Sequence, residues 1–262
     1  MKYIEQEKLK VIKFNKNNIY VAIDFDKTIT DTKSDDSWDA IGKLLGEEFK
    51  QELSNLYQKY RPIELSYQIP FDEKKIAMEK WYKECMNLYY KYHLTKEKLE
   101  KSVEKSNLIF RKGAKEFLKE MYENNVPVII LSAGIGNTIE LFLKENDSYY
   151  KNIFIISNFI RFDENGKMEK FEGQLIHSLN KSMEGNLPRE IEAELESKIY
   201  RLLIGDAVED KKMVPKEQWK NTVLTGFLNE NIDDNLEEYR RNFDITLTSD
   251  DANFENVKEI VF

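Results

Sequence analysis

The stretch from Ile19 to Thr30, which reads I-Y-V-A-I-D-F-D-K-T-I-T, constrains the fold of this chain more than any other. Its first seven residues are mostly β-branched or aromatic, as is typical of a buried strand in a parallel sheet. Two carboxylates, Asp24 and Asp26, follow where that strand should end. Residues two apart on a strand point to the same side, so both can face one site at the carboxyl edge of the sheet, where open α/β sheets bind ligands.

Two carboxylates buried together need a cation or a shared proton, because burying like charges side by side is otherwise too unfavourable. The pattern Asp-x-Asp-x-Thr after a hydrophobic strand therefore predicts a metal-assisted site. A calcium loop starting at Asp24 would need glycine at its sixth position and glutamate at its twelfth. Those positions hold Ile29 and Asp35, which excludes such a loop. A solvated turn at the end of a strand is the alternative at this point.

Composition excludes several classes of protein. The length of 262 residues suits a core with an insertion, and 41% hydrophobic residues are enough for a sizeable core. The net charge of −8 argues against a nucleic-acid polymer as partner, since binding a phosphate backbone needs a basic face. The single cysteine, Cys85, excludes an internal disulfide, and no run of residues resembles a signal peptide or a membrane span. We therefore expect a cytoplasmic protein without a membrane partner, and we favour a monomer.

The segment from Thr32 to Asn107 carries no strand pattern and is periodic like helices. Apolar residues at three- and four-residue spacing predict an amphipathic helix that begins near Ile41 and is ended by Arg61-Pro62. Further helices are expected over residues 72–92 and 96–106.

The rest of the chain alternates between helices and strands. Strands are expected at 126–131, 153–158, 199–204, 222–225 and 245–247. Asn165-Gly166 is a strong turn signal and predicts a hairpin. Repeated βα units indicate a mostly parallel sheet covered on both faces. We predict a doubly wound, Rossmann-like α/β core of residues 1–33 and 108–262, with an inserted all-helical cap of residues 34–107.

Polar residues follow three of the expected strands: the aspartate pair, Ser132 and Asp206. Ser132 could bind phosphate through its hydroxyl, with backbone amides assisting at a helix start, or it could be an ordinary helix cap. Asp206 and Asp210 offer further carboxylates to a hard cation, or they could form the acidic first turn of a helix. A lone lysine such as Lys181 is usually solvated. His93 and His177 lack the spacing of ligands or of a catalytic triad, so we assign them no chemistry.

Together these residues resemble one superfamily. The segment from Asp24 to Thr28, then Ser132, Lys181 and the pair Asp206 and Asp210, fall in the order of the four motifs of the haloacid-dehalogenase-like phosphatases. Further segments are similar to the cytosolic pyrimidine 5′-nucleotidases: 131–137, 157–159, 162–164, 173–181, 203–206 and 226–229 in the core, and 62–64 and 78–82 in the cap. The resemblance covers nearly the whole chain from residue 19 to residue 261.

The resemblance implies catalytic and metal-binding roles. Asp24 matches the nucleophile that becomes a phosphoaspartate, and Asp26 matches the acid that protonates the leaving oxygen and later activates water. Mg²⁺ would lie between Asp24, the backbone carbonyl of Asp26 and Asp206. Thr28 and Asp210 belong to the same motifs and would support the site.

The resemblance also implies a substrate site. Ser132, the Ala133 amide and Lys181 match groups that bind phosphate, and Glu64 matches a cap acid that contacts the nucleoside. Cys85 stands where the family usually has a serine that contacts the substrate.

Chemistry supports these roles independently. Uncatalysed phosphate monoesters hydrolyse extremely slowly, and a carboxylate nucleophile divides the reaction into two steps. An alkoxide leaves poorly and needs a proton, whereas a halide does not, so Asp26 favours phosphate over halogen chemistry.

Two departures from the family concern the loops beside the site. The residues from Asp31 to Trp38 are acidic, and the fourth motif has Ala207 and Glu209 where serine and glycine are usual. We expect a Mg²⁺-dependent phosphomonoesterase that acts on a small phosphorylated substrate, a pyrimidine nucleoside 5′-monophosphate. The alternatives are a phosphatase of the same superfamily for another small metabolite, and a binding protein without turnover.

Overall fold

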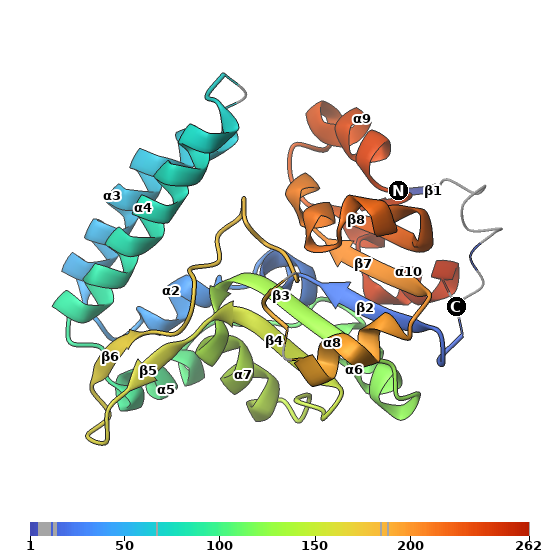
Figure 1. Ribbon diagram of the computed structural model, residues 1–262. Coiled ribbons are helices and arrows are strands. Elements are labelled where there is room, and N and C mark those ends of the chain that lie inside the picture. The colour runs from blue at the N-terminus through green and yellow to red at the C-terminus, as the bar shows by residue number, and fades with distance from the viewer. Residues whose placement is uncertain (5–11, 13–14, 67, 184, 188, 262) are drawn as a thin grey trace.

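The structure is a computed structural model that describes residues 1–4, 12, 15–66, 68–183, 185–187 and 189–261 (Figure 1). Its strands are β1 (Lys2–Ile4), β2 (Ile19–Ile23), β3 (Val128–Ile135), β4 (Ile153–Asn158), β5 (Ile160–Phe162), β6 (Met168–Phe171), β7 (Tyr200–Gly205), β8 (Thr222–Leu228) and β9 (Ile245–Thr248). Seven of them form one sheet in the order β1-β9-β8-β7-β2-β3-β4, and β5 and β6 form a hairpin. Every pair in the large sheet is parallel except β1 with β9.

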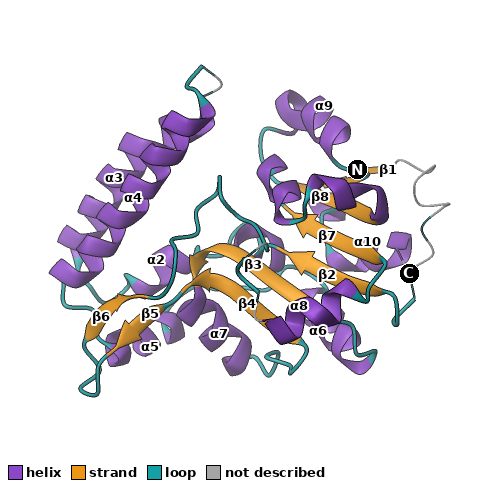
Figure 2. Ribbon diagram, viewed as in Figure 1, coloured by secondary structure: helices purple, strands orange, loops and turns teal. Residues whose placement is uncertain are grey.

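The side chains of β2 alternate between two cores. Ile19, Val21 and Ile23 pack in one cluster with residues of α6 (Ala114–Glu123), α7 (Gly136–Glu145) and α10 (Phe254–Val261). Tyr20 and Ala22 pack in a second cluster with residues of α8 (Arg189–Glu196) and α9 (Ile232–Asn242). Helices therefore cover both faces of the sheet (Figure 2), which confirms the doubly wound α/β fold.

The segment between β2 and α6 contains α2 (Ser37–Ile41), α3 (Glu47–Leu65), α4 (Phe71–Lys91) and α5 (Lys96–Glu104). The long helices α3 and α4 pack side by side and project from one side of the molecule (Figure 1). The short helices α2 and α5 instead pack against α7 of the core. Among the described residues, no helix has both the length and the apolar character of a membrane span.

The predicted helix from Ile41 to Arg61-Pro62 is wrong at two points. The chain breaks at Gly46, whose φ of 93° lies in a region that favours glycine, so α2 and α3 are separate helices. Helix α3 also continues through Pro62 to Leu65. Proline removes one helical hydrogen bond, to the carbonyl four residues earlier, but Gln58 at that position is exposed, so water can replace the missing donor.

Candidate active site

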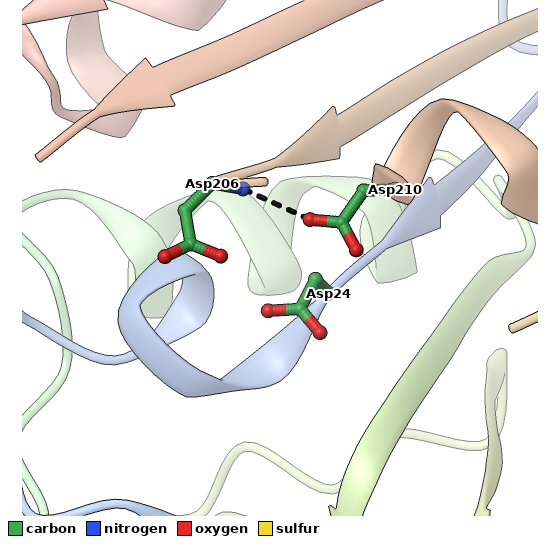
Figure 3. Close-up of side chains that lie close together, drawn as sticks. All are labelled: Asp24, Asp206 and Asp210. Carbon is green, nitrogen blue, oxygen red and sulfur yellow. Dashed lines mark hydrogen bonds between the residues drawn. The ribbon is translucent and has the colours of Figure 1, made fainter. Parts of the chain in front are cut away.

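Three acidic side chains meet at the carboxyl edge of the sheet. Strand β2 lies between β3 and β7, so the residues that follow these strands converge. Asp24 follows β2, Asp206 follows β7, and Asp210 lies in the next turn, η2 (Val208–Met213). Each of the three offers a carboxylate oxygen, and these oxygens all lie within 4.8 Å of one another (Figure 3).

Lys181 joins this cluster from the loop between β6 and α8. Its ammonium group donates to Asp24 Oδ1 and, at 2.9 Å, to Asp210 Oδ1. Its side chain is only 9% exposed, so it is not a solvated lysine. Burial alone would lower the pKa of Lys181, but the charges of Asp210 and Asp24 raise it well above its ordinary value. The lysine is therefore fully charged in the site.

The charges in the cluster do not balance. Burial raises the pKa of Asp24 to about 6, against the opposing effect of Lys181. Burial also raises the pKa of Asp206 well above its ordinary value, and the neighbouring carboxylates add to that shift. With all three carboxylates ionised, one lysine leaves two negative charges uncompensated.

The oxygens that remain available suit a hard divalent cation. Both oxygens of Asp210 are occupied, one by Lys181 and the other by the backbone amides of Asp206 and Ala207, at 3.1 and 3.0 Å. Asp24 accepts from Lys181 and from the Phe25 amide, and Asp206 accepts through Oδ2 from Asn229 at 3.2 Å, so neither carboxylate uses all its acceptor positions. Carboxylate oxygens are the ligands that Mg²⁺ prefers, so the donor set fits this ion.

Asp26 has different surroundings, although it is only two residues from Asp24. Its carboxylate accepts hydrogen bonds from the Ser37 amide, at 2.7 Å, and from the Ser37 hydroxyl, at 2.6 Å. Burial raises the pKa of Asp26 to about 7, and Asp36 adds to the shift. The Asp26 side chain is not part of the carboxylate cluster.

The segment Ser132-Ala133-Gly134 lies against Asp26. Ser132 is buried within β3 and its hydroxyl accepts from the Gly134 amide at 2.9 Å, while α7 begins only at residue 136, so Ser132 is not a helix cap. A Cβ at Gly134 would lie 2.8 Å from Asp26 Oδ2 and 3.0 Å from Ser132 Oγ, so only glycine permits this approach. The Ala133 carbonyl accepts from the Trp38 indole at 3.0 Å, which fixes the segment.

Glu64 links α3 to the loop that carries the lysine. Its side chain is 11% exposed, so the alternative of a solvated glutamate does not hold. One carboxylate oxygen accepts from the Ser178 hydroxyl, three residues before Lys181, and the other pairs with Arg61.

A cavity of about 650 Å³ lies between α2, α3 and α4. Aromatic rings and aspartates line it together with Cys85: Trp38, Phe49, Tyr57, Trp81, Tyr82, Asp35, Asp36 and Asp39. Burial raises the pKa of Cys85 to about 12, so it is a neutral thiol at physiological pH. The ring of Tyr82 contacts that of His177 with centroids 6.0 Å apart, which places the cavity beside the lysine loop.

Some residues around the site were not predicted from the sequence. Ser37 and Ser178 hold Asp26 and Glu64, and nothing in the sequence distinguishes them from other serines. Asn229 follows β8 and donates to Asp206 Oδ2 at 3.2 Å; its position at the end of a strand was a usable signal. Thr28 is buried, and its hydroxyl has no hydrogen-bond partner among the described residues.

Similar proteins were found at the level of sequence and of structure. The family described as Pyrimidine 5'-nucleotidase (UMPH-1) matches residues 33–262. The human 7-methylguanosine phosphate-specific 5'-nucleotidase is 32% identical over 213 residues, which are 80% of this chain and 70% of that protein. The protein of the same name from Drosophila melanogaster is 27% identical over 241 residues, which are 88% of this chain and 75% of that one.

Among solved structures, cytosolic 5'-nucleotidase IIIB bound to cytidine superposes with a TM-score of 0.82 at 25% identity, covering 98% of this chain and 88% of that one. A substrate-bound phosphoserine phosphatase superposes with a TM-score of 0.61 at 18% identity, covering 95% of this chain and 100% of that one. The second likeness concerns the fold.

Proposed function

Because the chain belongs to the pyrimidine 5′-nucleotidase (UMPH-1) family, within the haloacid-dehalogenase-like phosphatases, we propose that it hydrolyses nucleoside 5′-monophosphates with Mg²⁺ and through a phosphoaspartate at Asp24. Membership makes the protein a phosphoric monoester hydrolase; the metal, the intermediate and the substrate are the proposal. The observation that carries it is the cluster of Asp24, Asp206 and Asp210 around the Lys181 ammonium group.

In this proposal Asp24 attacks phosphorus. Lys181 donates to one oxygen of Asp24, which orients the carboxylate and leaves an ammonium group beside the transferring phosphoryl group. Forming the bond from Asp24 to phosphorus expels the nucleoside 5′-oxygen, and Asp26 delivers a proton to it. Water then attacks phosphorus while Asp26 takes its proton, the bond between phosphorus and Asp24 breaks, and inorganic phosphate leaves with the Asp24 carboxylate restored.

Asp24, Asp206 and the backbone carbonyl of Asp26 would hold Mg²⁺. The ion would neutralise charge on the phosphoryl group, where most catalysis of phosphoryl transfer lies. Asp210 would act on the site indirectly, by holding Lys181 and the two backbone amides after β7.

The remaining phosphate oxygens would be bound by the Ser132 hydroxyl and the Ala133 amide together with Lys181. Their support is geometric: the segment lies between Asp26 and the Trp38 indole, which fixes it before any ligand binds. Donors held in place in this way cost little reorganisation when charge develops.

The cavity beside α3 and α4 would bind the nucleoside, with Glu64 and Cys85 contacting it and residues 34–107 forming the cap. Aromatic rings suit a flat base, because stacking is favourable for every nucleobase. A second candidate substrate is 7-methylguanosine monophosphate, which the names of several relatives mention. Its methylated base carries positive charge, and Asp39 in the cavity lining has no salt-bridge partner among the described residues. We also propose a cytosolic location and a monomeric state.

A screen of phosphate release tests the proposal. The substrates are the pyrimidine and purine nucleoside monophosphates, 7-methylguanosine monophosphate, and common sugar and amino-acid phosphates, each with Mg²⁺ and with excess chelator. We expect a nucleoside monophosphate to be preferred and chelator to abolish release. The ratio of kcat/KM for 7-methylguanosine monophosphate to kcat/KM for guanosine monophosphate measures how much the positive charge of the base contributes. Preference for a sugar or amino-acid phosphate would overturn the proposed substrate class.

A further inference from the structure

Arg111 is a buried cation, 4% exposed, that lies between the two loops flanking the carboxylate cluster. Among the described residues no carboxylate lies within salt-bridge distance of its guanidinium group. Its hydrogen bonds go instead to four acceptors: the backbone carbonyls of Thr28 at 2.9 Å, of Ala252 at 2.7 Å and of Lys27, and the Asn229 side-chain oxygen at 3.0 Å. The guanidinium carbon also lies 4.5 Å from the centroid of the Phe227 ring. A buried charge without a carboxylate in direct contact is unfavourable, so this arrangement needs a reason.

Asn229 extends the contacts of Arg111 to the proposed metal ligands. Its side-chain nitrogen donates to the Lys27 carbonyl at 3.0 Å and to Asp206 Oδ2 at 3.2 Å. Because Arg111 can only donate, it holds the oxygen of the Asn229 amide on its own side. The nitrogen therefore faces Asp206, and the amide cannot flip without losing the bond to Arg111.

The backbone that Arg111 holds is in an uncommon conformation. Lys27 has φ 58° and ψ 12°, in the left-handed region that residues other than glycine rarely adopt. Its carbonyl receives donors from both Arg111 and Asn229, and its amide donates to Thr30 Oγ1 at 2.8 Å. This turn directly follows Asp24 and contains Asp26, so the bonds from Arg111 fix the path of the chain between two site residues.

We propose that Arg111 is a positioning residue for the metal site: through the Lys27 and Thr28 carbonyls and the Asn229 amide, it holds the ligands from β2 and β7 at the separation that one divalent cation needs. This inference rests on the proposed Mg²⁺-dependent function. A guanidinium group suits the task because it presents several donors in one rigid plane and stays charged. Its charge also lies near Asp206 and offsets part of the negative charge there.

Three variants test the inference. Arg111→Met keeps an unbranched stem but removes the donors and the charge, and Arg111→Lys restores the charge without the planar fork. Lys112→Met is the matched control, since Lys112 is the exposed neighbour and forms a salt bridge with Glu255 at the surface. For each protein, Mg²⁺ affinity is measured by calorimetry without substrate, and the Mg²⁺ activation constant is measured by phosphate release.

We expect Arg111→Met to weaken Mg²⁺ binding and raise the activation constant by about tenfold or more, the usual effect of losing a group that orients metal ligands. At saturating Mg²⁺ the KM for substrate should stay close to that of the wild type. Arg111→Lys should recover part of the affinity, and Lys112→Met should match the wild type. Circular dichroism and thermal melting establish that each variant is folded at the temperature of the assay.

If Arg111→Met does not fold, Asn229→Ala decides the question, because it cuts the link to Asp206 and leaves the guanidinium bonds to the backbone in place. It should weaken Mg²⁺ binding in the same direction. If folded Arg111→Met or folded Asn229→Ala binds Mg²⁺ like the wild type, Arg111 has only a structural role. That result would overturn this inference but not the proposed function. Wild-type protein that neither binds Mg²⁺ nor releases phosphate would overturn the proposed function as well.

Discussion

At the scale of single residues, two aspartates two positions apart have different chemistry because their neighbours differ. Asp24 lies against the Lys181 ammonium group, which favours the ionised form that a nucleophile requires. Asp26 lies against Ser37 and near Asp36, and burial raises its pKa to about 7, so it carries a proton in an appreciable fraction of molecules at neutral pH. When two neighbouring carboxyl groups have such different surroundings, one can act as the nucleophile and the other as the acid.

The first prediction concerns Asp26→Asn. General acid catalysis typically contributes a factor of about 10² to 10⁴, so turnover of a nucleoside monophosphate should fall by a factor in that range. An aryl phosphate with an acidic phenol needs no proton on its leaving group and should slow much less. Steady-state rates on both substrates provide the comparison. Equal slowing of the two would rule out the role of general acid.

The second prediction concerns Glu64→Ala. A charged hydrogen bond contributes about 1.5–3 kcal/mol, so kcat/KM for the best nucleotide should fall about ten- to a hundredfold. A small aryl phosphate does not reach the cap, and its hydrolysis should stay within a few-fold. Glu47→Ala is the matched control, because Glu47 is an exposed glutamate at the start of the same helix. If both substrates respond equally, or neither does, Glu64 does not contact the nucleoside.

At the scale of elements, the sequence predicts the helices and strands that hydrophobic periodicity reveals and the site residues that lie at the ends of strands. Asp24, Ser132 and Asp206 could be placed together because parallel strands share one carboxyl edge. Lys181 could not be placed by this rule, since it lies in a loop without regular structure; only its motif context indicated the site. The end of α3 was also mispredicted, because proline was expected to stop the helix. The helix continues past Pro62, since the exposed turn tolerates the loss of one hydrogen bond.

The loop that carries Lys181 contains a buried histidine, and the third prediction uses it. Burial lowers the pKa of His177 to about 4 from an ordinary value of 6.5, with Lys75 adding to the effect. Between these values the unfolded chain binds a proton that the folded chain does not, so stability falls as the pH falls through this window. One pKa unit corresponds to about 1.4 kcal/mol, so the loss attributable to His177 is at most about 3.5 kcal/mol.

His177→Asn should remove this part of the pH dependence, because asparagine does not titrate and its oxygen can still accept from the Leu179 amide, as His177 Nδ1 does. Urea unfolding at several pH values between about 7 and 4.5 measures the difference. His93→Asn is the control, since His93 is exposed. An identical pH dependence in the wild type and His177→Asn would mean that His177 does not stay neutral when folded.

At the scale of the whole molecule, the site lies where the core meets the projecting pair α3 and α4. Contacts across this boundary include Glu64 with Ser178, the Tyr82 ring with the His177 ring, and Lys212, whose ammonium group lies 4.9 Å from the centroid of the Phe71 ring. The boundary of the cap at residues 34–107 stays a prediction. Helices α2 and α5 fall inside it by sequence but pack on α7, and they share one apolar cluster with the neighbouring ends of α3 and α4.

The fourth prediction concerns the net negative charge of the buried carboxylate cluster and its effect on thermal stability. Three carboxylates and one lysine leave net negative charge in the cluster, so Mg²⁺ should raise the melting temperature of the wild type, and chelator should reverse the rise. Asp206→Asn removes one repelling charge and one ligand. It should melt at or above the wild type without Mg²⁺ and respond little when Mg²⁺ is added. A full response of Asp206→Asn to Mg²⁺ would place the ion elsewhere.

The central claim is that Asp24 forms the covalent intermediate, and acid quenching during turnover tests it most directly. Protein stopped in acid while turning over its best substrate is digested, and the peptides are searched by mass spectrometry for a phosphate that hydroxylamine removes. We expect this phosphate on the peptide that contains Asp24 in the wild type, and none in Asp24→Asn, which should also lose turnover. Phosphate on another residue, or undiminished turnover by Asp24→Asn, would contradict the account.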